Sequence, residues 1–160
     1  MQLIPNVVYL RELLIKDKMK KVFMIAAVAL IAVACNKNQS AVKKLDGTWE
    51  ATEINYSEDG ATVDLLEEGI VTSATYIFDG CKLKDDEFCS LTTTFVTIVG
   101  SGTESDLYNV IDDGETLQTK DDASSETINA ITIDELTRST LVLSQIDEDG
   151  NKTETKMEKQ

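Results

Sequence analysis

Short runs of apolar residues, separated by polar turns, dominate the chain from residue 43 to its end. Period-two alternation over such runs is typical of β-strands, and this part of the chain shows no convincing helical period. Asp-Gly pairs lie between several runs, and glycine accepts the positive φ that tight hairpin turns need. The pattern predicts nine strands, at residues 48–56, 62–66, 70–78, 90–99, 106–111, 116–120, 127–133, 139–146 and 152–158.

Repeated short strands separated by such turns predict an all-β fold, an antiparallel sheet that curls into a barrel or a sandwich. Leu141 and Leu143 are expected to share one face of a strand, as are Tyr76 and Phe78. Many other inward positions would be threonine or alanine, so we expect a lightly built core. Residues 134–138 are the one segment in which a helical turn is expected.

The strongest apolar run lies upstream, at residues 22–34, and has a different character. Lys20 and Lys21 precede it, and small residues lead from it to Cys35. A basic head, a short apolar core and small residues at the exit are the three parts of a secretory signal peptide. A helix of this length spans only about 20 Å, less than the ~30 Å hydrocarbon core of a bilayer. We therefore expect cleavage rather than a spanning segment.

These features divide the chain into four parts. Residues 1–18 are interpreted as an extension upstream of a true start at Met19, and residues 19–34 as the signal peptide. Residues 35–42 are expected to form a short polar tether. Residues 43–160 are expected to form one domain, because the mature chain is long enough for one core and too short for two.

The segment LIAVAC, residues 30–35, resembles the lipobox of bacterial lipoproteins, whose cysteine is acylated and becomes the mature N-terminus. The resemblance implies that Cys35 carries the lipid and holds the exported protein on a bacterial membrane. Asn36 follows the cysteine, and in that family the absence of an aspartate here favours the outer membrane. Stable anchoring takes more than one acyl chain, at about 0.8 kcal/mol per buried CH₂. The alternative is an ordinary signal peptide with a chance cysteine at its end.

The charge balance bears on the kind of partner. From Cys35 onward the chain carries ten basic and 27 acidic residues, a net charge of −17. Such a field repels nucleic acid and anionic lipid headgroups, so neither is expected as a partner. The excess acid is interpreted as a solvated, soluble surface; a cationic partner or loosely bound divalent ions are the alternative.

Catalytic and metal-binding motifs are missing from the sequence. It contains no histidine, which removes the usual general base and the commonest metal ligand. The spacing of acids from Asp147 resembles a calcium loop, but Gly150 stands at its fourth place rather than its sixth, so a plain hairpin turn explains it better. We expect no catalytic residue, no metal and no cofactor.

Two cysteines remain once Cys35 is assigned to lipid. Cys81 and Cys89 are separated by seven mostly charged residues and would lie in an oxidising compartment. We expect a disulfide at the base of a hairpin, which would contribute roughly 2–3 kcal/mol. Two free buried thiols are the alternative.

Gly47 and Trp49 match the Gly-x-Trp signature with which lipocalin-like domains of bacterial lipoproteins begin, and residues 135–143, ELTRSTLVL, are similar to a second stretch of that family. The resemblance covers about residues 43–158 and implies a small antiparallel up-and-down β-barrel of about eight strands. In the family an arginine from a late strand lies over the first-strand tryptophan. We hypothesise that Arg138 makes this cation–π contact, worth about 0.5–2 kcal/mol within ~6 Å of the ring.

The resemblance also implies a function, which is non-catalytic binding of a small apolar ligand. An eight-stranded barrel either holds one small ligand or is filled by its own side chains. In the second case the protein would be a cell-envelope interaction module without a cavity. The candidate lining residues are apolar strand positions: Trp49, Phe78, Phe95, Leu107 and Leu143.

Overall fold

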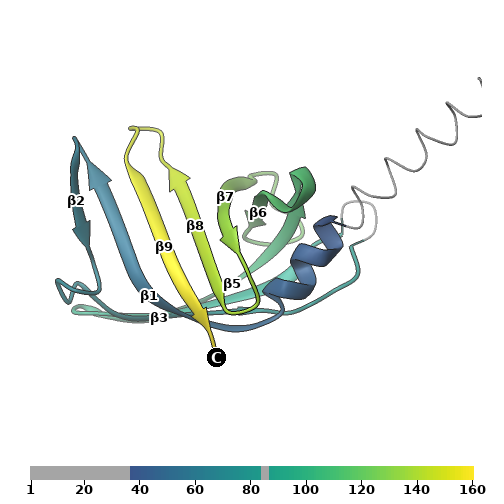
Figure 1. Cartoon of the computed structure of the whole chain (residues 1–160), viewed down its shortest axis with the longest axis horizontal. Helices are drawn as coiled ribbons and strands as arrows, with labels where there is room; N and C mark the ends of the chain where they lie inside the picture. The colour runs from purple at the N-terminus through teal and green to yellow at the C-terminus, as the bar shows by residue number, and fades with distance from the viewer. Residues whose placement is uncertain (1–36, 84–86) are drawn as a thin grey trace, which may run out of the picture. The chain divides into compact units, whose positions relative to one another are not determined.

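The computed structural model describes residues 37–83 and 87–160, and within them the chain forms one antiparallel sheet of nine strands (Figure 1). Neighbouring strands pair in the order β2-β1-β3-β4-β5-β6-β7-β8-β9, and β1 also pairs with β9. This second pairing closes eight strands into an up-and-down barrel and leaves β2 as an extra strand beside β1. The predicted all-β barrel is confirmed. The bounds are β1 Gly47–Glu58, β2 Ala61–Asp64, β3 Val71–Phe78, β4 Cys89–Thr97, β5 Gly100–Ile111, β6 Thr116–Lys120, β7 Asn129–Leu136, β8 Thr140–Ile146 and β9 Lys152–Lys159.

Several sequence predictions fall outside the described residues. They are the N-terminal extension at 1–18, the signal peptide at 19–34 and the acylation site at Cys35. In the part of the chain that the structure describes, no helix is long and apolar enough to cross a membrane.

The largest difference between a predicted and an observed strand is at β5, which begins at Gly100 rather than at residue 106. Its first residues are small and polar and carry no hydrophobic pattern. They still form a strand because they pair with β4 along their whole length. The Phe95 ring on β4 packs over Gly102, where an added Cβ would lie 2.6 Å from Cζ of Phe95. The Phe95 ring therefore occupies the space that a side chain at position 102 would fill.

The helical turn expected at residues 134–138 is wrong. Asp134 to Leu136 continue β7, whose register against β8 shifts between Ile133 and Glu135. Such a bulge adds one residue to a strand and interrupts its alternation. The interrupted alternation made the segment resemble a break in the sheet.

Residues 37–45 form a helix that the sequence pattern did not predict. Ala41, Val42 and Leu45 are spaced to lie on one helix face, and all three belong to the barrel core, with Val42 and Leu45 fully buried. Residues 37–42, expected to be part of a short polar tether, are therefore part of the fold. Lys37–Gln160 forms one compact unit, which begins before the predicted boundary at residue 43.

This helix lies across one end of the barrel, here called the closed end (Figure 1). Lys37 Nζ forms a 2.8 Å ion pair with Asp113, in the 3₁₀ turn Asp112–Gly114 between β5 and β6. Lys44 Nζ donates to the Leu136 carbonyl at 3.3 Å, and Lys159 Nζ donates to the Lys44 carbonyl at 2.8 Å. The helix is thus fixed to the β5–β6 connection, the end of β7 and the end of β9.

The β3–β4 connection is also at the closed end and carries the disulfide. Cys81 and Cys89 are bonded, with their Cα atoms 5.6 Å apart. Cys89 is the first residue of β4 and is 3% exposed, while Asp79 N donates to the Ser90 carbonyl beside it. The predicted disulfide at the base of a hairpin is confirmed.

Candidate functional site

The strand register shows which side chains face the barrel interior. Side chains alternate along a strand, and residues paired across two strands share a face. Cys89 and Leu91 on β4 are buried, so Thr93 and Phe95 face inward as well. Their partners on β5 complete this part of the inner wall: Tyr108, Asp106, Glu104 and Gly102.

The closed half of the interior is filled. Its largest side chains are at most 1% exposed: Val42, Leu45, Trp49, Phe78, Tyr108, Leu141 and Met157. Phe78 and Tyr108 meet edge to face at 5.2 Å between ring centroids, and the Tyr108 hydroxyl donates to the Asp79 carbonyl at 3.1 Å. Side chains this inaccessible show that the interior at this end is filled by the protein itself. Two predicted lining residues, Trp49 and Phe78, therefore belong to the packed end of the barrel.

The Gly-x-Trp segment holds this end together. Trp49 Nε1 donates a 2.6 Å hydrogen bond to the Leu45 carbonyl, one of the carbonyls that a helix end leaves without an intrahelical partner. Lys159 Nζ lies 5.1 Å from the centroid of the Trp49 ring. Gly47 has φ +123°, and a Cβ there would lie 2.9 Å from Cε of Lys159. Position 47 needs glycine because its φ is positive and because a Cβ there would collide with the Lys159 side chain.

The hypothesised partner of Trp49 is corrected by this arrangement. The cation over the ring is Lys159, which pairs with Trp49 across β1 and β9. Arg138 is exposed in the turn between β7 and β8. A cation lies over the tryptophan as expected, but it comes from the last strand and not from this turn.

The open half of the interior is less tightly packed. Tyr76, Thr93, Phe95 and Thr155 face inward by register, yet each is only half-buried, so solvent reaches the inside of the barrel. Burial raises the pKa of the Tyr76 hydroxyl. Tyr76 on β3 and Thr155 on β9 lie on either side of β1, which pairs with both strands. The site therefore combines aromatic and hydroxyl groups.

Two further predicted lining residues have different positions. Leu143 faces inward beside Ile133, and each is 8% exposed. Leu107 lies between Asp106 and Tyr108, which face inward, so alternation directs Leu107 to the outside. Of the five predicted lining residues, Phe95 and Leu143 are in the open half of the interior.

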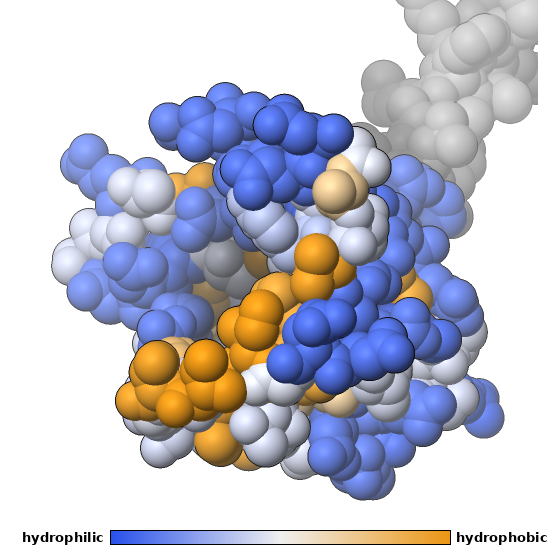
Figure 2. All heavy atoms as spheres, turned by 90° about the vertical axis from the view of Figure 1, so that its left-hand side faces the viewer, coloured by the Kyte–Doolittle hydropathy of each residue, from blue (hydrophilic) through white to orange (hydrophobic). Residues whose placement is uncertain are grey.

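An apolar rim borders the open end, and we call Ile70, Ile98 and Val99 the mouth patch. Their exposures are 44%, 74% and 90%, and Ile98 N donates to the Ile70 carbonyl at 3.2 Å, which joins the β2–β3 loop to the β4–β5 turn. Figure 2 shows this end of the barrel, where apolar side chains gather beside a recess. Large exposed apolar residues in one patch are typical of binding sites.

Asp64 fixes the loop that carries Ile70. Its Oδ1 accepts hydrogen bonds from the backbone N–H groups of Ile54 at 3.2 Å and Leu66 at 2.9 Å. Burial opposes ionisation of the Asp64 carboxyl, but the hydrogen bonds from Leu66, Ile54 and Glu67 outweigh it and lower the pKa. The ionised carboxylate thus ties the β2–β3 loop to β1.

Acidic side chains dominate the open end, where Lys152 is the cation at a strand end within the described residues. The Lys120 side chain is directed away from it, with Nζ 4.4 Å from the centroid of the Phe88 ring in the β3–β4 connection. Asp106 faces the interior; burial raises its pKa, and the charges of Glu104 and Asp121 raise it further. In the β8–β9 turn, Asp147 Oδ1 accepts from the N–H groups of Asp149 and Asn151, which agrees with the predicted plain turn. The acids at this end are Glu58, Asp59, Glu67, Glu68, Glu104, Asp106, Asp121, Asp122, Asp147, Glu148 and Asp149.

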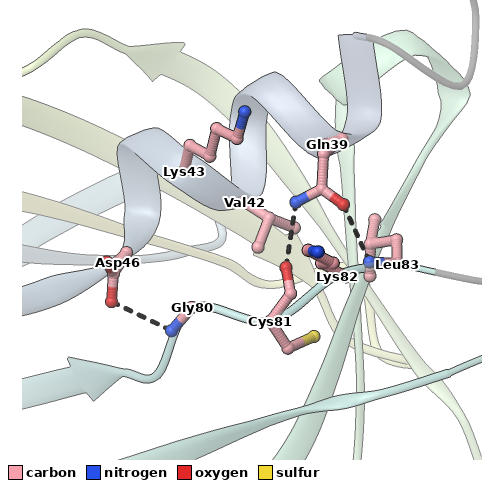
Figure 3. A pocket seen from close by; sticks show the side chains of 8 residues that line it. All are labelled: Gln39, Val42, Lys43, Asp46, Gly80, Cys81, Lys82 and Leu83. Atoms are coloured by element: carbon pink, nitrogen blue, oxygen red, sulfur yellow. Dashed lines mark hydrogen bonds between the residues drawn. The ribbon is translucent and has the colours of Figure 1, made fainter.

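A separate groove lies at the closed end, between the helix and the β3–β4 connection (Figure 3). Its volume is about 520 Å³, and Val42 and Leu83 provide apolar lining. Gln39 donates to the Cys81 carbonyl at 2.9 Å and accepts from Leu83 N at 2.8 Å, while Asp46 accepts from Gly80 N at 2.9 Å. These hydrogen bonds hold the helix to the connection, so we regard the groove as a structural joint.

Comparison with known proteins gives similarity of structure only. No model of a protein family matches the chain, and no characterised protein matches its sequence. Solved structures similar to it include the siderocalin Ex-FABP, described as having dual ligand specificities, with 12% identity, a TM-score of 0.49 and coverage of 72% of this chain and 73% of that one. Bovine odorant-binding protein in complex with undecanal has 18% identity and a TM-score of 0.44, with coverage of 73% of this chain and 72% of that one. A lipocalin-like protein of Bacteroides uniformis has 18% identity and a TM-score of 0.40, with coverage of 73% of this chain and 99% of that one. Because these identities and TM-scores are low, the fold is assigned from the strand pairing of the chain itself, which forms a lipocalin-like barrel.

Proposed function

We propose that this chain is an exported, lipid-anchored protein whose lipocalin-like barrel binds a small molecule with an apolar body, without catalysis. The observation that supports binding is the difference between the two halves of the barrel. The closed half is packed, whereas Phe95 and Tyr76 face an interior that solvent enters, beneath the mouth patch. Clefts with mostly apolar walls and a few polar groups are typical of small-molecule sites.

The charge at the open end narrows the class of ligand. A mouth lined by one sign of charge repels ligands of that sign and attracts the opposite sign. Asp106 and Glu104 face the interior, and acids surround the rim. We therefore propose a neutral or cationic apolar ligand, such as a long-chain alcohol or amine, rather than a fatty acid anion.

Export and anchoring are supported by the sequence around Cys35 and by the disulfide. Disulfides persist mainly in oxidising compartments, and Cys81 and Cys89 are bonded in this chain. The proposed acylation of Cys35 would tether the barrel to the outer membrane. Mass spectrometry of the N-terminal peptide of the membrane-extracted protein tests this step: acyl mass on Cys35 supports it, and an unmodified cysteine contradicts it.

Ligand binding is tested by displacing a fluorescent apolar probe with three ligands of equal chain length: dodecanol, dodecylammonium and dodecanoate. We expect the first two to displace the probe at concentrations at least tenfold lower than dodecanoate. Phe95→Ala should weaken binding, while the matched control Leu107→Ala, on the outer face of the neighbouring strand, should not. Equal loss in both variants would contradict the assigned interior.

The second candidate is the interaction module without a ligand, which the mouth patch favours, because Ile98 and Val99 are 74% and 90% exposed. Such exposure also fits a surface for a protein partner. Native mass spectrometry of protein purified gently from its own host separates the two candidates. A reproducible added mass that organic extraction removes supports ligand binding. A bare protein mass, with no displacement by any of the three ligands, supports the interaction module.

A further inference from the structure

A cleft of about 500 Å³ at the closed end is lined by four cationic side chains and one serine: Ser40, Lys43, Lys44, Arg138 and Lys159. Its lining contains no carboxylate. This composition contrasts with the net charge of −17 from Cys35 onward. The cleft therefore concentrates positive charge on a protein that is otherwise strongly acidic.

The cleft is part of the fixed framework of the closed end. Lys159 Nζ is held by the Lys44 carbonyl at 2.8 Å and by the Trp49 ring, and Lys44 Nζ contacts the Leu136 carbonyl at 3.3 Å. Both partners are neutral, so these contacts bring no negative charge to the two ammonium groups. The ion pairs found among residues 37–83 and 87–160 involve Lys37, Lys152 and Lys156, and none involves a cation of the cleft.

The positive charge is confined to the cleft, because Ser40 and Lys44 also line a neighbouring pocket that contains Asp113, Asp134 and Glu135. The cleft lies where the helix meets the β7–β8 turn and the end of β9, while the mouth and its acids lie at the other ends of the same strands. Charges farther apart than the Debye length, about 8 Å at physiological ionic strength, are largely screened from one another. A charged surface seated on the cleft itself therefore interacts more strongly with its four cations than with the acids at the far end of the barrel.

We propose that this cleft binds the anionic headgroups of the membrane that carries the protein, and that the barrel stands with its mouth directed away from the bilayer. The proposal rests on the lipid anchor of the proposed function. Only two peptide steps join Cys35 to Lys37, and a chain spans at most about 3.6 Å per residue. An acylated Cys35 would hold Lys37, in the helix, within about 7 Å of the lipid surface.

Electrostatic attraction then selects the orientation. Each Lys or Arg near an anionic membrane strengthens binding roughly fivefold. The acids of the mouth are repelled by the same surface. The proposal differs from the sequence-based expectation that anionic headgroups are not partners, because that expectation treated the charge as uniform.

The test is lysine footprinting of the full acylated chain, reconstituted into vesicles of neutral phosphatidylcholine with or without anionic phosphatidylglycerol. An amine-reactive reagent labels exposed lysines, and mass spectrometry gives the labelling of Lys43 and Lys44 relative to Lys152, at the open end, in the same molecules. We expect at least threefold protection of Lys43 and Lys44 in anionic vesicles, and none in neutral vesicles. Equal labelling in both kinds of vesicle would overturn the proposal.

Two variants of equal net charge provide the matched control. K43E/K44E should abolish the protection of the remaining cleft lysine, Lys159, whereas K152E/K156E, at two β9 lysines that do not line the cleft, should leave it unchanged. Inorganic phosphate is added to the chain in neutral vesicles as a separate arm. Protection by phosphate as strong as that by anionic lipid would show a small-anion site and overturn membrane docking.

The anchor is measured separately, as the fraction of protein that stays with the vesicles in 1 M salt. Release at high salt would contradict acylation at Cys35, and the footprint at low salt would still report on the cleft. Retention without protection of Lys43 and Lys44 would leave the anchor intact and overturn the inference about the cleft.

Discussion

The helix at residues 37–45 gives the most direct test of the fold, through Leu45→Ala. The Leu45 side chain is fully buried, and the helix contacts the barrel on one face only. Leu→Ala at such a position removes the transfer free energy of the side chain and leaves a cavity, which together cost about 2–5 kcal/mol. For a compact unit of this size, a loss of about 3 kcal/mol lowers Tm by roughly 10 °C.

Urea unfolding followed by tryptophan fluorescence measures this loss. Trp49 is the only tryptophan in the sequence, and it donates to the Leu45 carbonyl, so its emission reports on the joint between helix and barrel. Ser40→Ala, at an exposed position of the same helix, is the control and should change the free energy of unfolding by less than about 0.5 kcal/mol. If Leu45→Ala also falls within that range, the helix is not part of the cooperative core and the reasoning is refuted.

Three further predictions concern the closed end. Gly47→Ala should lower the free energy of unfolding by about 1–3 kcal/mol in urea titrations, because position 47 has φ +123° and a Cβ would lie 2.9 Å from Lys159; an unchanged midpoint would contradict this. Cys89→Ala should cost roughly 2–3 kcal/mol, and reduction of the wild type should reproduce that loss, because the bond closes a separation of eight residues. Burial raises the pKa of Tyr108, with Asp46 and Asp79 adding to the shift, so the folded state retains this proton while the unfolded chain loses it above about pH 10. Stability should therefore fall with rising pH in that range, by at most about 1.4 kcal/mol per pH unit for this group, and Tyr108→Phe should make the decline shallower in urea titrations between pH 8 and 11.

The sequence predicted the strands well because turn chemistry and alternation are local signals. The Asp59-Gly60 turn shows how: both residues have positive φ, as a tight hairpin requires, so the two strands beside it could be placed from the sequence. The helix at 37–45 was missed because its apolar face holds only Ala41, Val42 and Leu45. Three apolar residues are too few for a periodic pattern to distinguish a helix from a polar linker. The helix is recognised only from the structure, where these residues are buried in the barrel core.

The site was harder to predict because inward positions depend on register. Bulges between Ala51 and Glu53 and between Ile133 and Glu135 shift the alternation, and the sequence does not mark them. Leu107 was chosen for its apolar character, although its neighbour Tyr108 is the residue that faces the core. The shared face of Tyr76 and Phe78 was a usable signal, and it would have identified Tyr76 as part of the wall.

The identity of the cation over Trp49 depended on barrel closure. Arg138 and Lys159 both line the cleft at the closed end, so either was a reasonable partner for the ring. The choice follows from the pairing of β1 with β9, which places Lys159 directly opposite Trp49. No local pattern reports a pairing between residues so far apart in the chain.

That pairing also determines when the barrel can be completed. Glu53 and Lys156 are 103 residues apart in sequence and form an ion pair across β1 and β9. Contacts between such distant residues make folding slow, because the chain must close a long loop before the contact can stabilise it. Until β9 is present, β1 and β8 each keep an unpaired edge, and such edges are prone to pair with other chains. The last strand therefore covers both of these edges at once and protects β1 and β8 from pairing with other chains.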